Sequence, residues 1–154
     1  MDIIIQTLTA TVVVYLIAIV LDAPKKTLPY AALTGAAGWF VYLLAGSESS
    51  VVFSTFIASC VIAFLAHVFS RVSEAPTTVF LISALYPFVP GTSVYRAVYS
   101  LIGNDLEAFK FYALQSILIS GAIATAVFAI DSIFIIHGKI KKYHSVEEQR
   151  ANTI

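Results

Sequence analysis

The chain has 154 residues, of which 59% are hydrophobic and 12% charged, and its formal net charge is zero. Soluble domains carry about 25% charged residues, so this composition indicates one integral membrane domain of packed helices and excludes a separate soluble catalytic module. The balanced charge gives no electrostatic basis for binding nucleic acid, which requires a clustered basic surface.

The first three apolar segments each predict a membrane-spanning helix. They cover residues 3–21, 30–45 and 51–69. Helices of about 20 apolar residues cross a hydrocarbon core of about 30 Å. The first segment has no positive charge before it, so we expect a retained span rather than a removable signal peptide. In the second segment, Ala31 with Gly35 and Thr34 with Gly38 are small pairs at a spacing of four, which favours close helix packing in lipid.

The fourth apolar segment, residues 77–89, is short for a span and ends in a predicted helix break. Pro87 and Pro90 lack a backbone donor and clash with the preceding turn, and Gly91 is free to take a positive φ. The apolar and polar spacing that follows predicts a short helix over residues 92–103. We therefore expect a Pro/Gly-broken fourth span.

The last apolar segment, residues 111–136, predicts a fifth span, so residues 1–137 form the transmembrane domain and residues 138–154 a cytoplasmic polar tail. With five spans and the amino terminus outside, most basic residues fall on the cytoplasmic side, as the positive-inside rule requires. These are Lys25, Lys26, Arg71, Lys139, Lys141, Lys142 and Arg150, against Arg96 and Lys110 on the other side. If residues 77–89 were only re-entrant, this asymmetry would mostly vanish.

The segment after the break predicts a site for an anionic solute. A helix that starts at Thr92 presents backbone N–H groups and the positive end of its dipole. The candidate substrate contacts are Thr92, Ser93, Tyr95 and Arg96, because hydroxyls and a guanidinium can hold a carboxylate. The alternative is that the break merely ends the span at the outer interface, where Arg96 and the tyrosines anchor an amphipathic surface helix.

Asp131 is the one acid well inside an apolar segment, and intramembrane carboxylates are costly enough to suggest proton coupling. It shares a helical face with Ser116, Ser120 and Ala124, and we expect that face to meet protein. The alternative is that Asp131 reaches interfacial water or pairs with Lys139.

Other polar residues within the spans have ordinary structural interpretations. His67 could transfer protons, but it precedes Arg71 by four residues and is expected at the cytoplasmic interface. Gln6 and Gln115 are expected to form interhelical hydrogen bonds.

The sequence lacks enzymatic motifs: it contains no His and acid at metal-ligand spacing, no glycine-rich phosphate loop and no nucleophile with a convincing base. Cys60 stands alone in an apolar run and is expected to pack there. We therefore expect no enzymatic activity, no metal and no cofactor.

Two stretches, APKKTLPYAALTGAAGW and APTTVFLISALYPFVPGTSVYRAV, resemble the bacterial threonine/serine exporter family, specifically the short subunit that matches the second half of the longer fused exporters. The resemblance covers nearly all of residues 3–136, and its most specific part is PFVPG followed by Tyr95, supported by Pro24 and Pro76. It implies export of threonine and serine in some members and of C4 dicarboxylates such as succinate in others, usually driven by the proton gradient. It also implies a larger membrane subunit that contains the other half.

The sequence therefore predicts a subunit of a secondary exporter in the bacterial inner membrane, working by alternating access with that larger partner. The roles of Arg96 and Asp131 rest on local chemistry alone. Two other functions stay open. One is a non-transporting assembly or regulatory subunit, and the other is a homo-oligomeric channel lined by Ser116, Ser120 and Asp131.

Overall fold

The computed structural model describes residues 3–46 and 50–151, with side chains placed as far as residue 136. Within these residues the chain forms helices and no strands, which confirms the all-α membrane bundle expected from the sequence. The helices are α1 (Ile3–Val20), α2 (Leu28–Gly46), α3 (Val51–Ser73), α4 (Thr77–Leu85), α5 (Gly91–Ile102) and α6 (Leu106–Ala151), with 3-10 turns η1 (Lys25–Thr27) and η2 (Tyr86–Phe88).

The number of membrane crossings depends on one broken helix pair. Four described stretches are long and apolar enough to cross alone, namely Ile3–Val20, Lys25–Gly46, Val51–Ser73 and Leu106–Ile136. A fifth crossing is formed if Thr77–Phe88 and Gly91–Ile102, which are bent by 47°, count as one span. The described residues thus hold up to five spans, and the fourth is the broken one that the prolines predict.

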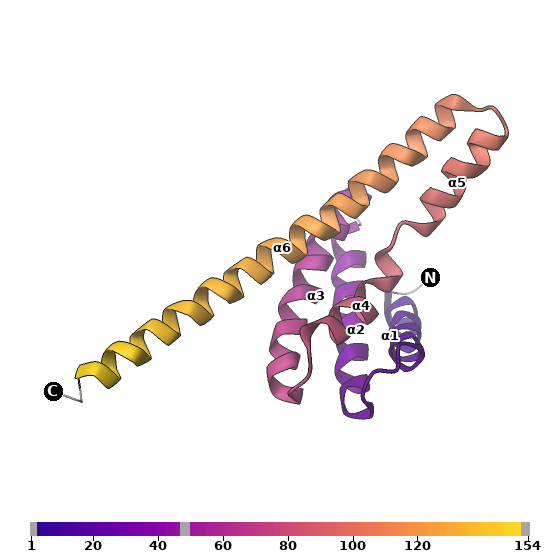
Figure 1. The fold of residues 1–154 in the computed structure, drawn as a ribbon. Helices are drawn as coiled ribbons and strands as arrows, with labels where there is room; N and C mark the ends of the chain where they lie inside the picture. The colour runs from indigo at the N-terminus through magenta and orange to yellow at the C-terminus, as the bar shows by residue number, and fades with distance from the viewer. Residues whose placement is uncertain (1–2, 47–49, 152–154) are drawn as a thin grey trace.

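Helices α1 to α4 form a bundle in which glycines of α2 lie close to side chains of α1 and α3 (Figure 1). A Cβ built at Gly35 would lie 2.5 Å from Cγ2 of Val14 on α1, and one built at Gly38 would overlap Ile62 on α3. The buried residues of α2 are Leu28, Ala31, Ala32, Thr34, Gly35 and Gly38. The two small-residue pairs of this helix therefore pack closely, as predicted, because small side chains let helix backbones approach in lipid.

The break between α4 and α5 is held against α2 by aromatic rings. Phe88, which is 6% exposed, has its ring centroid 5.5 Å from that of Trp39 and 5.6 Å from that of Tyr42. Aromatic rings at such distances attract one another beyond their buried area. The end of η2 is thereby fixed to the bundle, whereas the chain beyond it turns away.

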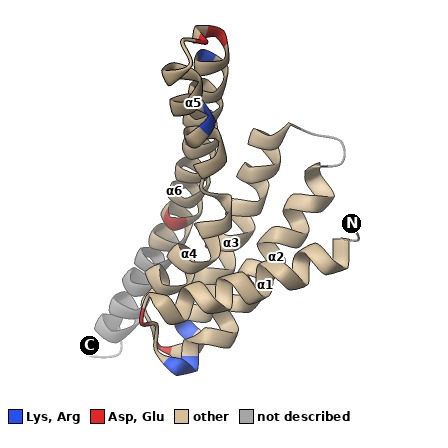
Figure 2. Cartoon of the chain, turned by 90° about the vertical axis from the view of Figure 1, so that its right-hand side faces the viewer, with Lys and Arg blue, Asp and Glu red and all other residues tan. Residues whose placement is uncertain are grey.

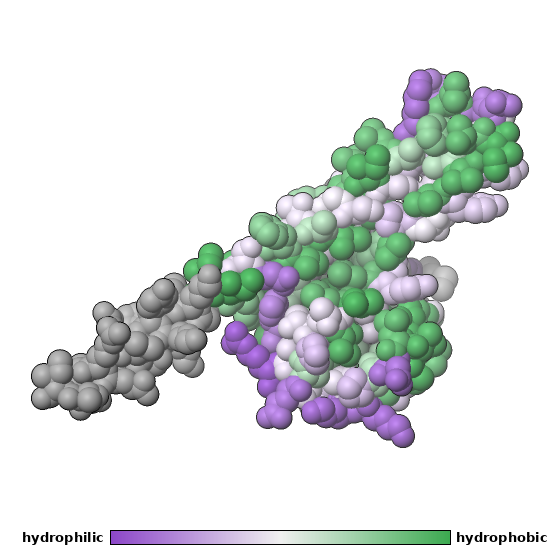
Figure 3. Space-filling model, viewed as in Figure 1, coloured by the Kyte–Doolittle hydropathy of each residue, from purple (hydrophilic) through white to green (hydrophobic). Residues whose placement is uncertain are grey.

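Helix α5 and the first third of α6 form a hairpin that projects beyond the bundle, and we call residues 91–121 the arm (Figure 1). α5 packs chiefly on α6, and the rest of α6 crosses α3. Much of the arm's visible face is hydrophobic (Figure 3). Its exposed large apolar residues are Val94, Tyr95, Val98, Tyr99, Leu101, Ile102, Leu106, Phe111, Leu114, Ile117 and Leu118. The arm thus presents a surface suited to lipid or to another apolar protein.

Several local expectations differ from the structure. No glycine among the described residues has a positive φ; Asp22, Glu74 and Asn104 take that conformation instead. Gly91 therefore does not use its extra freedom. The last helix begins at Leu106 rather than at residue 111. The expected polar tail, residues 138–154, lies outside the described side chains.

Candidate functional site

The broken span changes direction within a few residues. η2 ends at Phe88, the N–H of Gly91 donates to the carbonyl of Val89 at 2.7 Å, and the N–H of Val94 donates to the carbonyl of Pro90 at 3.0 Å. Pro90 is the N-cap of α5, and no side chain caps the helix. Pro90 supplies no N–H of its own, which favours a helix start here over a continuous helix.

A cavity of about 240 Å³ borders this break on the side of α1 and α2. Its lining residues are Gln6, Thr9, Ala10, Val13, Trp39 and Pro87. None of the four expected substrate contacts is among them. The indole Nε1 of Trp39 is buried without a hydrogen-bond partner, a costly state for a donor.

The expected substrate contacts lie instead on the arm, and only two of them face α6. The Ser93 hydroxyl donates to Oε1 of Gln115 at 3.3 Å, and the guanidinium carbon of Arg96 lies 5.5 Å from the ring centroid of Tyr112. Thr92 is exposed, and Tyr95 is 67% exposed, its ring 6.2 Å from that of Tyr99. The structure therefore brings Ser93 and Arg96 to a polar seam between α5 and α6.

Arg96 is a cation in an apolar arm, and among the described residues no carboxylate pairs with it. Arg96 is exposed, and its contact with the Tyr112 ring is a cation–π interaction. The five donors of a guanidinium are not satisfied by a ring face. Arg96 is thus able to accept an additional anionic partner.

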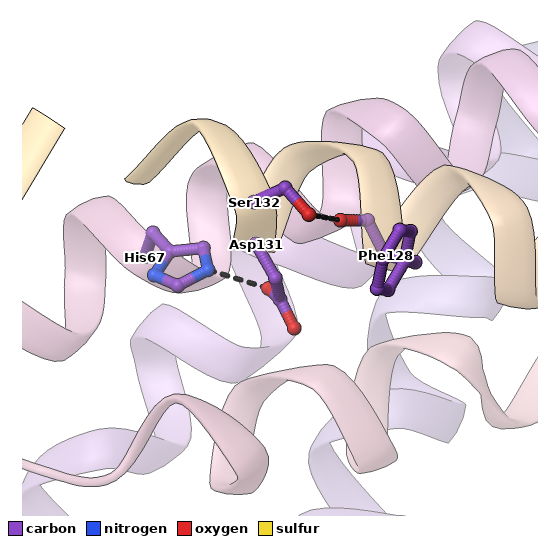
Figure 4. Close-up of polar contacts among 4 residues, drawn as sticks. All are labelled: His67, Phe128, Asp131 and Ser132. Atoms are coloured by element: carbon purple, nitrogen blue, oxygen red, sulfur yellow. Dashed lines mark hydrogen bonds and ion pairs between the residues drawn. The ribbon is translucent and has the colours of Figure 1, made fainter. Parts of the chain in front are cut away.

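A second polar site joins α3 to α6. Nε2 of His67 and Oδ1 of Asp131 lie 2.6 Å apart, with side chains 18% and 39% exposed (Figure 4). The His67 ring also stacks on Phe134, with centroids 4.3 Å apart and planes inclined by 12°. The guanidinium of Arg71 lies 5.2 Å from the centroid of the same Phe134 ring.

This pair does not follow from the sequence patterns. For Asp131 they indicate proton coupling, interfacial water or a pair with Lys139, whose side chain lies outside the described part, and for His67 they indicate the interface. The usable signal was topological: with five spans, the third and the last run in the same direction. His67, four residues before Arg71, and Asp131, eight before Lys139, then fall at similar depths.

The other polar residues of α6 divide between faces. Ser116 is buried and donates to the carbonyl of Tyr112 at 2.8 Å, whereas Ser120 and Ala124 are exposed. Within the described chain, this face is therefore covered at Ser116 and left open at Ser120 and Ala124. Gln115 forms an interhelical hydrogen bond, as expected.

Comparison with known proteins finds one matching family and a partly matching relative. The family model described as "Threonine/Serine exporter, ThrE" matches residues 6–133. An uncharacterized protein of Haemophilus influenzae is 35% identical over 111 residues, which cover 71% of this chain and 37% of that protein. The matched part is thus little more than a third of that relative's length. None of the solved structures matches the chain significantly.

Proposed function

The chain belongs to the threonine/serine exporter family, and from this premise we propose that it is a subunit of a secondary transporter that exports small carboxylate-bearing metabolites. Threonine, serine and C4 dicarboxylates such as succinate are the substrates to test. We place it in the bacterial inner membrane with its amino terminus outside and its carboxy terminus in the cytoplasm, where the positive-inside rule puts most Lys and Arg.

The position of Arg96 is the observation that supports a carboxylate-bearing substrate. A guanidinium within an apolar arm is costly unless it has a function or a partner, and its contact among the described residues is the Tyr112 ring. A carboxylate can bind it through two parallel hydrogen bonds. Ser93, one turn earlier on α5, can donate a hydroxyl to the same solute. In this proposal Thr92 and Tyr95 complete the contact surface from the exposed side of α5.

The helix break supports movement of this site. In transporters, discontinuous helices near the bilayer midplane commonly form solute sites, because their open backbone ends can bind ions and polar groups. Here Pro87, Pro90 and Gly91 separate α4, which is held in the bundle, from α5, which packs chiefly on α6. Bending at this point would open the site at Arg96 first to one side of the membrane and then to the other, as alternating access requires.

The arm also supports a requirement for a larger membrane partner. Its apolar residues are exposed, and the chain matches 37% of its Haemophilus influenzae relative. We propose that the partner covers the arm and completes the solute path, and that the proton gradient drives export.

Reconstitution tests this function. The chain and candidate larger subunits from the same organism are placed in proteoliposomes, together and separately, and export of labelled threonine, serine and succinate is measured with and without a proton gradient. We expect flux that needs both subunits and responds to the gradient. Full flux from the larger subunit alone would favour an assembly role for the chain, and downhill flux from the chain alone without response to the gradient would favour a channel.

A further inference from the structure

The contact between His67 and Asp131 has a distinct position in the fold. Among the described side chains it is the one contact between a basic and an acidic group that joins two different helices, because the other, Lys110 with Glu107, lies within α6. It connects α3 of the bundle to α6, the helix that carries the arm. A change in this contact therefore acts on the bundle and on the proposed substrate seam together.

We propose that His67 and Asp131 form one proton-binding site that couples export to the proton gradient. This inference rests on the proposed function and adds to it the residue pair that holds the proton. The sequence patterns give His67 and Asp131 separate roles, whereas the 2.6 Å contact makes the imidazole and the carboxylate parts of the same site.

Charge accounting supports a carrier role. With a neutral imidazole that donates Nε2–H to an ionised Asp131, the pair has a net charge of minus one. When a proton binds the second ring nitrogen, Nδ1, the pair becomes an imidazolium and a carboxylate with no net charge. A buried net charge in the membrane is costly, so the loaded pair is favoured when water is excluded and release is favoured when water returns.

The neighbours of the pair hold the imidazole in place without neutralising the carboxylate. Phe134 stacks on the His67 ring from α6, one turn beyond Asp131, and Arg71 lies over the same Phe134 ring at the end of α3. Arg71 is exposed. The packing of Phe134 fixes the orientation in which Nε2 meets Oδ1.

The other helices packed against α3 contribute few titratable groups. α4 has no ionisable side chain, and in α2 these groups are Tyr30, whose ring contacts Phe69, and Tyr42, whose ring contacts Trp39 and Phe88. The transferred species is one proton, taken up from water on one side and released to water on the other, and no other bond is made or broken.

The test uses membrane vesicles from the native host, in which the chromosomal gene is replaced by His67→Gln, Asp131→Asn or Ser132→Ala. Ser132 is the matched control, because its hydroxyl donates to the carbonyl of Phe128 within α6 and does not contact the pair (Figure 4). For a substrate that wild-type vesicles carry, two rates are measured: accumulation driven by a proton gradient, and exchange of labelled for unlabelled substrate at equal pH on both sides.

We expect His67→Gln and Asp131→Asn to lose gradient-driven accumulation about tenfold or more and to show a flat rate between about pH 5.5 and 8. Exchange should stay within about threefold of wild type, because the substrate site is not altered. Ser132→Ala should match wild type in both rates. A swapped double variant, His67→Asp with Asp131→His, should recover part of the gradient-driven rate.

Gradient-driven accumulation that persists in either single variant overturns the inference, and so does loss of both rates at normal membrane levels, which would indicate a structural role. If the single variants do not reach the membrane, the swapped variant decides: retained pH dependence supports the pair, and its absence overturns it. Wild-type vesicles that carry none of the substrates contradict the proposed function itself. Wild-type vesicles that carry substrate without any response to the gradient contradict the proton site alone.

Discussion

Oδ1 of Asp131 and Nε2 of His67 lie 2.6 Å apart although the two residues are separated by 64 positions in the sequence. The contact ties α6 to α3 at a part-buried position, so removing one partner leaves the other without its hydrogen bond. An unsatisfied part-buried polar group of this kind costs about 1–3 kcal/mol.

We therefore expect Asp131→Ala to lower the free energy of unfolding by about 1–3 kcal/mol, measured by thermal denaturation of the purified chain in mild detergent. Asp131→Asn keeps an acceptor for the imidazole and should cost less, and Ser132→Ala should cost little. An Asp131→Ala variant as stable as wild type would show that the contact contributes nothing to the fold.

Substitution by alanine should change the stability of the chain in opposite directions at two glycines with different surroundings. A Cβ at Gly35 would meet Val14, whereas a Cβ at Gly91 would meet no atom within 4 Å, and Gly91 has no positive φ. Gly35→Ala should destabilise the bundle by about 1–3 kcal/mol through overpacking. Gly91→Ala should be neutral or stabilise by up to about 1 kcal/mol. Denaturation midpoints of both variants check this, and equal effects would contradict the close packing of α1 on α2.

Arg96→Ala should reduce export at least about tenfold without changing the amount of protein in the membrane, because the substrate loses a charge-assisted partner. Arg96→Lys should retain part of the rate, since an ammonium keeps the charge but not the paired hydrogen bonds. The control is Lys110→Ala, a cation on the same arm whose partner is the exposed Glu107. Undiminished flux in Arg96→Ala would remove this residue from the substrate site.

The double variant Pro87→Ala with Pro90→Ala should straighten the broken span and slow export. A proline within a helix costs about 3 kcal/mol, so its removal favours a continuous helix. Spin labels on α4 and α5, at Ile82→Cys and Val98→Cys in a Cys60→Ser background, should move apart. Pro29→Ala is the control, because Pro29 stands in the first turn of α2, where proline is tolerated. Unchanged label distances would show that the bend has another cause.

Membrane orientation can be checked with a membrane-impermeant maleimide in the same Cys60→Ser background. Lys and Arg residues lie at the foot of the bundle and on the arm, two well separated levels (Figure 2). Lys110→Cys should be labelled in intact cells and Lys26→Cys only after permeabilisation, since basic residues concentrate on the cytoplasmic side. The reverse pattern would invert the proposed topology.

The helices and the break between α4 and α5 could be predicted from short stretches of the sequence. The apolar segments have lengths that fit a bilayer, and Pro87 and Pro90 cannot continue a helix without loss, so the broken fourth span followed from a few residues. The positive φ that glycine allows at position 91 is not adopted. Glycine can take that conformation, but its presence does not show that the backbone needs it. The bend is produced between Phe88 and Gly91 with ordinary negative φ values.

The contacts between helices could not be predicted from the sequence in the same way. Ser93 with Gln115 depends on the register of α5 against α6, and His67 with Asp131 depends on where α6 crosses α3. Helical periodicity places each residue on a face of its own helix but does not say which face of a neighbour it meets. For the same reason the shared face of Ser116 and Ser120 does not reveal that this chain buries Ser116 and leaves Ser120 exposed.

The chain contains a single tryptophan, Trp39, which lies beside the break between α4 and α5. Its ring lies 5.5 Å from that of Phe88, and it lines the cavity together with Pro87. Indole emission shifts with the polarity and hydration of its surroundings. A change in the bend between α4 and α5 would therefore be visible as a change in intrinsic fluorescence. Trp39 is thus a native fluorescent probe of the proposed bending at residues 87–91, with no label required.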